Sequence, residues 1–488
     1  MSRITELYAI EILDSRARPT VKAYCTLDSG AKAEVSVPSG ASTGTAEALE
    51  LRDGDPKRYN GLGCQQAVEN ISTTIRDALK ERDFTTQSDL DAALLELDGT
   101  PNKSKLGANA ILGVSLAFAR AQAAEANVPL YHHFANMWNG VPRLPKLTIN
   151  LFSGGKHAGG QVPIQDVLVV PVAAKSISEG LAMTYDVYQA AIKLTAEKYN
   201  TRPLKADEGG LAPPFPSVDV MLADAVASIE RAGYVPGEQV VLAVDVASSH
   251  FHIDGRYHIN DQGLDSAGMV ALLMDWLARY PIISIEDGLA EEDWAGWQMF
   301  YQAAHDKAMI LGDDLLCTNP KRIQQAIDSQ AANSLLLKVN QIGTLTEALK
   351  SYDIACHAGW KVVVSARSGE TEDNWLADLA TGWAGDYIKI GSIMQSERLT
   401  KYNRLLEIEA LGVFSSYPIE TLKVSAECLE ALTHSGFSNI DDLTSFLEQT
   451  WGGRAGTVRV SHQFLTHFDE IVAQLKAQGF WPESLKDR

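Results

Sequence analysis

The sequence predicts an α/β protein with a small α+β amino-terminal domain, a (β/α)8-type barrel and a helical carboxyl-terminal extension. Three patterns support this prediction: strand-like runs followed by helical periodicity at the start, eight short apolar runs in the middle, and helical periodicity again at the end. The chain has 488 residues, of which 45% are hydrophobic, enough to fill a barrel core and an appended domain. We expect the three parts to span residues 1–138, 139–415 and 416–488.

The amino-terminal α+β capping domain is predicted from a change of pattern. Residues 7–37 contain strand-like runs separated by the turn-forming segments "DSRARP" and "DSG". From residue 65 to about residue 136 the apolar residues recur at helical spacing instead. The segment "NGVPRLPK", which contains a glycine and two prolines, is interpreted as the linker to the barrel.

The barrel is predicted from eight apolar runs of strand length, most of them separated by segments with helical periodicity. The runs are "LTINLF", "VLVVP", "VVLAVDV", "IISIED", "MILGDD", "SLLLKVN", "KVVVSAR" and "YIKIG". The first two are joined only by "SGGKHAGGQVPIQD", which is too short for a crossover helix. We therefore expect this pair to form an antiparallel hairpin, unlike the standard parallel barrel.

Six charged residues lie at or near the carboxyl end of a different predicted strand. They are Asp245, Glu286, Asp313, Lys338, Arg367 and Lys389. Barrel enzymes gather their catalytic groups at this end of the strands. A single charged residue there could simply end a strand in solvent, whereas six together indicate an active site.

Asp245, Glu286 and Asp313 come from three successive strands and are predicted to bind one metal ion. Converging carboxylates repel one another unless a cation lies between them. A set of oxygen ligands without cysteine or paired histidine favours Mg²⁺ over Ca²⁺ or Zn²⁺. Their neighbours Asp287 and Asp314 should point to the opposite face of each strand and are interpreted as structural.

Lys338 and Lys389 follow on later strands of the same barrel mouth. A lysine beside Mg²⁺ and a second lysine should have a lowered pKa and could act as a base. Alternatively, either lysine could form a salt bridge with the metal-binding carboxylates. Arg367 and Ser368 form a cluster of donors suited to an oxyanion. Metal, base and oxyanion cluster together suit removal of a proton α to a carboxylate.

Three loops supply further candidates. Glu208, in "KADEGGLAPP", could protonate a leaving hydroxyl if burial raises its pKa. His157 lies between two glycine pairs in "SGGKHAGG", where a single histidine is more often a surface residue. Ser42, in "PSGASTG", could reach a metal or a phosphate if this loop closes as a lid.

Residues 1–410 resemble the enolase (phosphopyruvate hydratase) family. The resemblance rests on many motifs in the family's order: "DSRARPTV", "SVPSGASTG", "EALELRDGD", "GANAILGVSLA", "GGKHAGG", "DEGGLAP", "SIEDG", "GDDLLCTNP", "LLLKVNQIGT", "RSGETED" and "SERLTKYN". It implies an α+β amino-terminal domain on a barrel that opens ββαα. The short first connection of the predicted barrel indicates the same opening.

The resemblance implies two Mg²⁺ ions and a lysine base. Asp245, Glu286 and Asp313 would bind the first, conformational ion, and Ser42 would meet a second ion that the substrate bridges. Lys338 would be the base that takes the C2 proton of 2-phosphoglycerate.

The resemblance also implies roles for the remaining candidates. Glu208 would assist loss of the C3 hydroxyl, and Lys389 would hold the substrate carboxylate. Arg367 and Ser368 would hold the phosphoryl group, and His157 matches the family's loop histidine.

The chain departs from the family pattern on what we expect to be the ligand side of the barrel. Ala366 replaces a histidine beside the phosphoryl group, and Asp166 replaces a glutamate that works with the acid. Ala46 replaces a lid histidine, and Ile390 and Gln395 stand where the family tends to have threonine and arginine. The predicted metal ligands and the lysine base are retained.

Three functions are compatible with this pattern. The first is a Mg²⁺-dependent, reversible dehydration of 2-phosphoglycerate to phosphoenolpyruvate, slowed by the missing imidazole. The second is a related reaction on a phosphoenolpyruvate-like substrate in phosphonate or phosphinate natural-product biosynthesis, with room supplied by the smaller Ala366 and Asp166. The third is a binding protein without catalysis.

Amino-acid composition limits the kinds of partner that the protein is expected to bind. Lysine and arginine total 42 against 62 aspartate and glutamate, and the net charge of −20 disfavours nucleic acid or an anionic membrane as partner. The five cysteines are scattered and, with no signal peptide or membrane span in the sequence, indicate a cytoplasmic protein. We expect a small phosphorylated carboxylate as substrate and, from the resemblance, a homo-oligomer, a dimer or higher.

The segment after about residue 420 exceeds the expected length of the family. Helical periodicity in "AECLEALTHSG", "IDDLTSFLEQT" and "FLTHFDEIVAQLKAQG" predicts three short helices. The sequence leaves open whether they cover the barrel mouth, form an oligomer contact or lie free of both.

Overall fold

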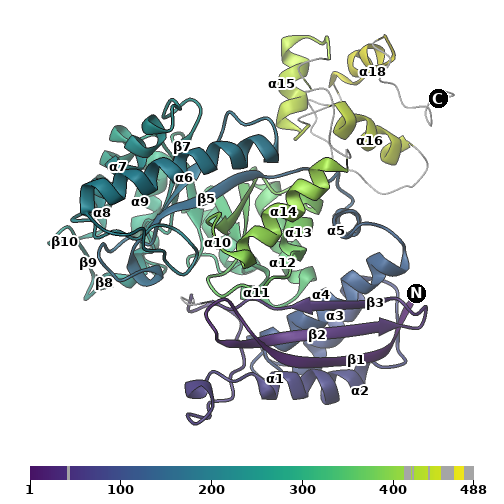
Figure 1. The fold of residues 1–488 in the computed structure, drawn as a ribbon. Coiled ribbons are helices and arrows are strands. Elements are labelled where there is room, and N and C mark those ends of the chain that lie inside the picture. The colour runs from purple at the N-terminus through teal and green to yellow at the C-terminus, as the bar shows by residue number, and fades with distance from the viewer. Residues whose placement is uncertain (41–43, 412–418, 420–421, 438–439, 452–465, 478–488) are drawn as a thin grey trace.

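The computed structural model shows an amino-terminal domain, a barrel and a group of carboxyl-terminal helices (Figure 1). It describes residues 1–40, 44–411, 419, 422–437, 440–451 and 466–477. None of the helices within these ranges is long and apolar enough to cross a membrane.

The amino-terminal domain is an antiparallel sheet with helices, as the sequence predicts. Its strands have the order β3-β2-β1-β4, with bounds β1 (Ser2–Leu13), β2 (Pro19–Leu27), β3 (Lys32–Ser36) and β4 (Asp83–Phe84). Its helices are α1 (Gln65–Asn70), α2 (Arg76–Leu79), α3 (Gln87–Asp98), α4 (Ala108–Glu125) and α5 (Leu130–Trp138). Because α4 is apolar on almost every side, it is buried at the centre of the domain, against β2 and β3.

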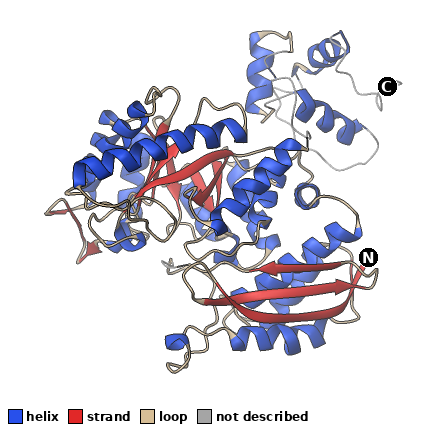
Figure 2. Cartoon of the chain, in the orientation of Figure 1, coloured by secondary structure: helices blue, strands red, loops and turns tan. Residues whose placement is uncertain are grey.

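Eight strands close into a barrel that helices surround (Figure 2). The strands are β5 (Lys146–Ser153), β6 (Asp166–Val170), β7 (Val241–Asp245), β11 (Ile282–Glu286), β12 (Met309–Gly312), β13 (Ser334–Leu337), β14 (Lys361–Ser365) and β15 (Tyr387–Gly391). Strand β6 is antiparallel to both β5 and β7, and the other neighbouring pairs are parallel. The predicted antiparallel hairpin at the start of the barrel is therefore confirmed.

Two helices follow β6 before the chain returns to the barrel, which completes the ββαα opening. The barrel helices are α6 (Ile177–Tyr199), α7 (Val218–Arg231), α8 (Ser266–Arg279), α9 (Trp294–Ala304), α10 (Pro320–Ser329), α11 (Val339–Ile342), α12 (Leu345–His357), α13 (Trp375–Gly382) and α14 (Ser396–Ala410). A small antiparallel sheet, β8 (His252–Ile253), β9 (Arg256–Ile259) and β10 (Gln262–Leu264), follows β7.

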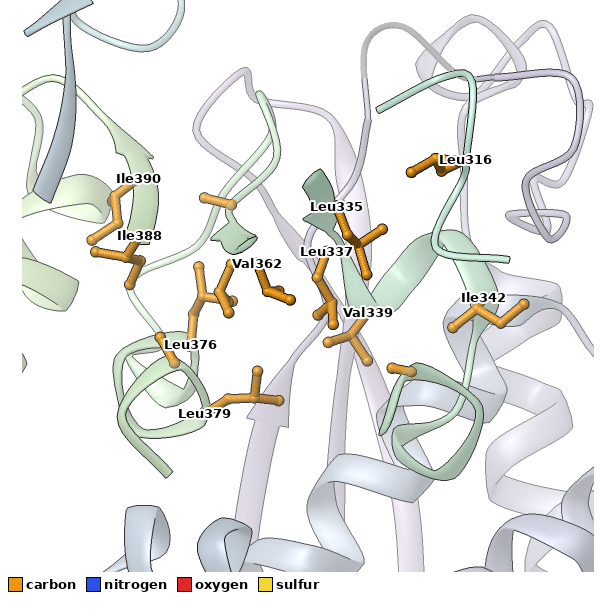
Figure 3. Close-up of a cluster of buried hydrophobic side chains, with 14 of the residues drawn as sticks. Leu316, Leu335, Leu337, Val339, Ile342, Val362, Leu376, Leu379, Ile388 and Ile390 are labelled. Atoms are coloured by element: carbon orange, nitrogen blue, oxygen red, sulfur yellow. The ribbon is translucent and has the colours of Figure 1, made fainter. Parts of the chain in front are cut away.

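Side-chain alternation along β13, β14 and β15 separates the outer core from the barrel interior. On the outer face, apolar side chains of these strands pack against α12 and α13. Strand β13, which carries Leu335 and Leu337, contacts α12, while β14 and β15 contact α13, as Figure 3 shows for Val362, Ile388, Leu376 and Leu379. On the inner face, Leu336 and Val363 form a separate cluster. Lys338 lies two residues after the inward-facing Leu336, and Lys389 lies between the outward-facing Ile388 and Ile390. Strand alternation therefore directs both lysines into the barrel.

The carboxyl-terminal extension contains helices in all three segments for which the sequence predicts them. They are α15 (Ala426–His434), α16 (Ile440–Trp451) and α18 (Phe468–Ala477), grouped in one lobe in Figure 1. Their apolar side chains, among them Leu432, Leu443 and Ile471, form a cluster distinct from that of the barrel. Helix α5 ends at Trp138 and β5 begins at Lys146, while the boundary predicted at 415/416 lies outside the described residues.

Candidate active site

The barrel brings the predicted carboxylates and lysines to its carboxyl end. Asp245 ends β7 and is the direct neighbour of Glu286, which ends β11. Lys389 Nζ donates to Asp245 Oδ2 at 2.8 Å and to Glu286 Oε2 at 2.6 Å. Lys338 Nζ donates to Asp313 Oδ2. The salt bridges that the sequence allows for both lysines are thus present.

These charged groups are buried and their oxygens are positioned by amides. Gln165 Nε2 donates to Asp245 Oδ2 at 3.1 Å, and Gln341 Nε2 donates to Asp313 Oδ1 at 2.8 Å. Both glutamines were missed in the sequence, because only the fold places them against the carboxylates.

The donor set fits a hard divalent cation. Three buried carboxylates face two ammonium groups, which leaves negative charge uncompensated. Glu286 Oε1 is buried and has no hydrogen-bond partner among the described residues. Burial and the neighbouring Asp245 carboxylate raise the pKa of Glu286 well above its ordinary value. Asp245, Glu286 and Asp313 would hold the cation, and oxygen donors of this kind suit Mg²⁺.

A compact group of carboxylates at the barrel mouth includes only one of the predicted metal ligands. Within the described part of the chain, ligand oxygens of Asp287, Asp313 and Asp314 lie within 4.8 Å of one another. Lys389 joins the other two predicted ligands, Asp245 and Glu286, and Lys338 binds Asp313.

Asp287 has a structural role, in line with the sequence interpretation. Its Oδ1 accepts from the Asp313 backbone N–H at 2.9 Å, and its Oδ2 accepts from the Asp314 N–H at 2.7 Å. Its own φ of 44° turns the chain sharply after β11. Asp287 therefore fixes the backbone that presents the Asp313 carboxylate to the site.

The pKa of the lysines differs from the sequence prediction. Burial lowers the pKa of Lys338, but the Asp313 carboxylate raises it more, so that it lies above its ordinary value. Burial also lowers the pKa of Lys389, but Asp245 and Glu286 outweigh burial and raise this pKa well above its ordinary value. The sequence predicts a lowered lysine pKa only where Mg²⁺ compensates these carboxylates. Without that positive charge, the ion pairs with the carboxylates raise the pKa of both lysines.

His157 is buried and paired, which corrects the interpretation of a surface histidine. Its Nδ1 lies 2.7 Å from Asp166 Oδ2, and its Nε2 lies 3.8 Å from Glu208 Oε1. Ser153 Oγ donates to the other Asp166 oxygen at 2.5 Å, and Asn150 Nδ2 donates to Glu208 Oε2 at 3.0 Å. The structure thus joins the predicted residues His157, Asp166 and Glu208 in one cluster.

Within this cluster the proton belongs to His157 rather than Glu208. Burial lowers the pKa of His157, but Asp166 and Glu208 outweigh it and raise the pKa to about 9. Burial alone would raise the pKa of Glu208, yet His157 and Arg398 hold it below its ordinary value. The condition under which Glu208 could act as the acid, a pKa raised by burial, is therefore not met, because the neighbouring cations outweigh burial.

Arg367 and Ser368, the residues of the predicted oxyanion cluster, contact residues of the amino-terminal domain. Arg367 Nη1 and Nη2 contact the Glu47 carboxylate at 3.0 and 3.1 Å. Arg16 Nη1 donates to Ser368 Oγ at 3.1 Å, and Arg398 binds the backbone carbonyls of Arg367 and Ser368 at 2.6 Å each. Arg16 was missed, although it lies within the motif "DSRARPTV".

The positions that depart from the family pattern lie in different environments. Ala366 is only 7% exposed and packs within the hydrophobic core at the end of β14. Ile390 alternates with Lys389 and lies with Ile388 on the outer face (Figure 3). The expectation that Ile390 lies on the ligand side is therefore wrong. Ser42 lies outside the described residues.

Comparison with protein families gives two matches. A family model described as "Enolase, N-terminal domain" matches residues 4–134, and one described as "Enolase, C-terminal TIM barrel domain" matches residues 142–422. The second match alone covers more than half of the chain. Both coincide with the domain and the barrel seen in the structure.

Replacing Asp287 tests its structural role. In Asp287→Ala, two buried N–H groups lose their acceptor, at a cost of about 1–3 kcal/mol each. We expect the free energy of unfolding, measured by urea denaturation, to fall by about 2–6 kcal/mol. Asp306→Ala, at an exposed aspartate, is the control. Equal stability of the two variants would contradict the assignment.

Proposed function

The chain belongs to the enolase family, and on this basis we propose that it removes water from 2-phosphoglycerate to give phosphoenolpyruvate, with Mg²⁺ as cofactor. Family membership makes it a lyase of the enolase superfamily that uses a divalent metal. The substrate, the identity of the metal and the role of each residue are our proposal.

The observation that supports this proposal best is the contact of Lys338 with Asp313 beside the Asp245, Glu286 and Lys389 cluster. A base and a metal-binding carboxylate share one hydrogen bond at the mouth of a closed barrel. Abstraction of a proton next to a carboxylate needs the base at the α carbon and the positive charge at the adjacent carboxylate oxygens.

Lys338 takes the proton from C2, and the electron pair of the C–H bond moves onto the substrate carboxylate. The pair then returns to form the C2–C3 double bond as the C3–O bond breaks and the hydroxyl departs. Lys389 holds the substrate carboxylate, and Arg367 and Ser368 hold the phosphoryl group. Asp245, Glu286 and Asp313 would hold a divalent cation, whose positive charge would stabilise the substrate carboxylate as that group gains negative charge. The same charge would lower the pKa of Lys338, as a base requires.

The leaving hydroxyl needs a proton to depart as water. His157 carries that proton, because its pKa is about 9, and Glu208 Oε1 is 3.8 Å from its Nε2. Asp166 holds the imidazole through Nδ1 at 2.7 Å. We assign Glu208 to the contact with the hydroxyl and His157 to the proton supply behind it, with Asp166 as the positioning residue.

A second candidate function has its own supporting observation. Ala366 stands where the family has a histidine, at the end of β14 that leads into Arg367 and Ser368. The same proton abstraction could therefore act on a phosphoenolpyruvate relative in phosphonate or phosphinate biosynthesis. Ser42 as ligand of a second Mg²⁺ remains part of the proposal for either substrate.

We also propose a homo-oligomer, with no nucleic acid or membrane partner. Apolar side chains of β1 are exposed, namely Tyr8 at 40%, Ile10 at 42% and Leu13 at 52%. A strand surface of this kind suits contact with a second copy of the chain.

Removal of the proposed base should abolish turnover. For Lys338→Ala we expect the rate of phosphoenolpyruvate formation from 2-phosphoglycerate, followed by ultraviolet absorbance with Mg²⁺, to fall by about 10²–10⁴-fold or more. Exchange of the C2 hydrogen with deuterated solvent should stop as well. Lys361→Ala, at an exposed strand end outside the site, should retain both activities. Continued exchange in Lys338→Ala would assign the base elsewhere.

Restoring the imidazole distinguishes the two candidate substrates. If 2-phosphoglycerate is the substrate, Ala366→His should raise its turnover by about 10²–10³-fold, the value of one transition-state hydrogen bond. Thermal unfolding of both proteins checks that the larger side chain is accommodated. If neither protein acts on 2-phosphoglycerate while Mg²⁺ binds to both, the altered substrate is favoured instead.

Charged substitutions on β1 test the oligomer. Light scattering of the full chain should give a dimer or a multiple of it, and Ile10→Lys combined with Leu13→Glu should give a monomer. Ile253→Lys, at a residue 56% exposed in β8, should leave the mass unchanged. A monomeric unmodified chain at micromolar concentration would exclude the proposal.

A further inference from the structure

A second cluster of metal-ligating side chains lies in the carboxyl-terminal extension, outside both family matches. Cys428, His467 and Glu470 each offer a ligand atom, and these atoms lie within 4.8 Å of one another. We propose that these three residues bind a borderline divalent cation, Zn²⁺ foremost, separately from the barrel site.

The three residues come from two helices. Cys428 lies in the first turn of α15, while His467 precedes α18 and Glu470 lies in the first turn of α18. His467 Nδ1 and Glu470 Oε2 are 3.5 Å apart. Ligands at zinc bond lengths of about 2.0–2.3 Å in a tetrahedron are separated by about 3.3–3.6 Å. The pair therefore already has the spacing of two zinc ligands.

The donor types select the metal. A thiolate, an imidazole and a carboxylate form a mixed sulfur, nitrogen and oxygen set, which suits Zn²⁺ and excludes Mg²⁺ and Ca²⁺. Three protein ligands leave the fourth position for water. Cys428 is fully buried, whereas the His467 and Glu470 side chains are 26% and 34% exposed, so a cation can enter from their side.

Ser425 orients two of the ligands. Its backbone N–H and its Oγ donate to the two Glu470 oxygens at 2.5 and 2.9 Å, and its Oγ accepts from the Cys428 N–H at 3.3 Å. Each carboxylate oxygen has a second lone pair, so these hydrogen bonds leave Glu470 able to bind a cation. Support of this kind is what surrounds metal ligands in proteins.

A metal ion here would stabilise a unit with little core of its own. The extension buries a small apolar cluster, and α15 and α18 are separated along the chain by α16. Small domains with such cores are commonly held by a metal or a disulfide. Binding replaces the thiol S–H bond with a sulfur–metal bond, and the proton is released to solvent.

Cobalt(II) provides a direct test on the full-length protein, because sulfur ligation produces an ultraviolet charge-transfer band. The described ligand groups of the barrel mouth contain only oxygen and nitrogen, so the band reports on the extension alone. After treatment with a chelator, and with Mg²⁺ present to occupy the barrel site, titration with Co²⁺ should give a band that saturates at one equivalent per chain, and Zn²⁺ should remove it. Excess Mg²⁺ should leave the band unchanged.

Variants assign the band to this site. Cys428→Ser should abolish it, and His467→Gln should weaken Co²⁺ binding at least tenfold. Cys356→Ser, at an exposed cysteine outside the cluster, is the matched control and should behave as the unmodified chain. Circular dichroism shows whether Cys428→Ser folds, and His467→Gln keeps the test valid if it does not.

Two results would overturn the proposal: absence of the band in the unmodified chain, or its persistence in Cys428→Ser. Neither result bears on the lyase reaction, which is measured separately with 2-phosphoglycerate. Conversely, an inactive barrel would leave the cobalt band unaffected.

Discussion

The compensation of buried negative charge at the carboxyl end of the barrel is the constraint on which the site depends. Asp245, Glu286 and Asp313 are removed from water, and such burial is unfavourable unless each carboxylate finds a partner. Lys389 and Lys338 satisfy part of this requirement. The remaining negative charge, together with a Glu286 Oε1 that has no hydrogen-bond partner in the part of the chain that the structure describes, favours a divalent cation at this site.

The same principle explains the cluster on the other side of the mouth. With aspartate at residue 166, the carboxylate binds Ser153 and His157 at once, and His157 stands between it and Glu208. Because the His157 imidazolium lies between the Asp166 and Glu208 carboxylates, it keeps its proton at a pH where a free histidine is neutral. The barrel mouth thus holds a protonated imidazole although residue 366 offers none.

Much of the fold was predictable from local sequence, and much of the electrostatics was not. The hairpin at the start of the barrel follows from one short connection, and the inward direction of Lys338 and Lys389 follows from strand alternation. The same alternation places Ile390 outside, which motif comparison alone did not reveal. The pKa of Glu208 depends on His157 and Arg398, which are distant in sequence, so burial alone gave the wrong direction. Likewise, the sequence around Cys428 indicates only an ordinary thiol, because His467 and Glu470 are distant in sequence and only the fold places them beside it.

The carboxylate and lysine cluster and the Arg367–Ser368 segment are held in place by different parts of the fold. This difference limits which part of the site can change during evolution. The carboxylates and lysines all lie at the ends of barrel strands or directly after them, and neighbouring strands fix one another's positions. The oxyanion end is assembled between domains: Glu47 binds Arg367, Arg16 binds Ser368, and Ser39 pairs with Gly369. A change in the amino-terminal domain can therefore alter that end without moving the metal ligands. A lyase of this family can therefore keep the carboxylates and lysines at its strand ends in place while the interdomain segment around residue 366 changes.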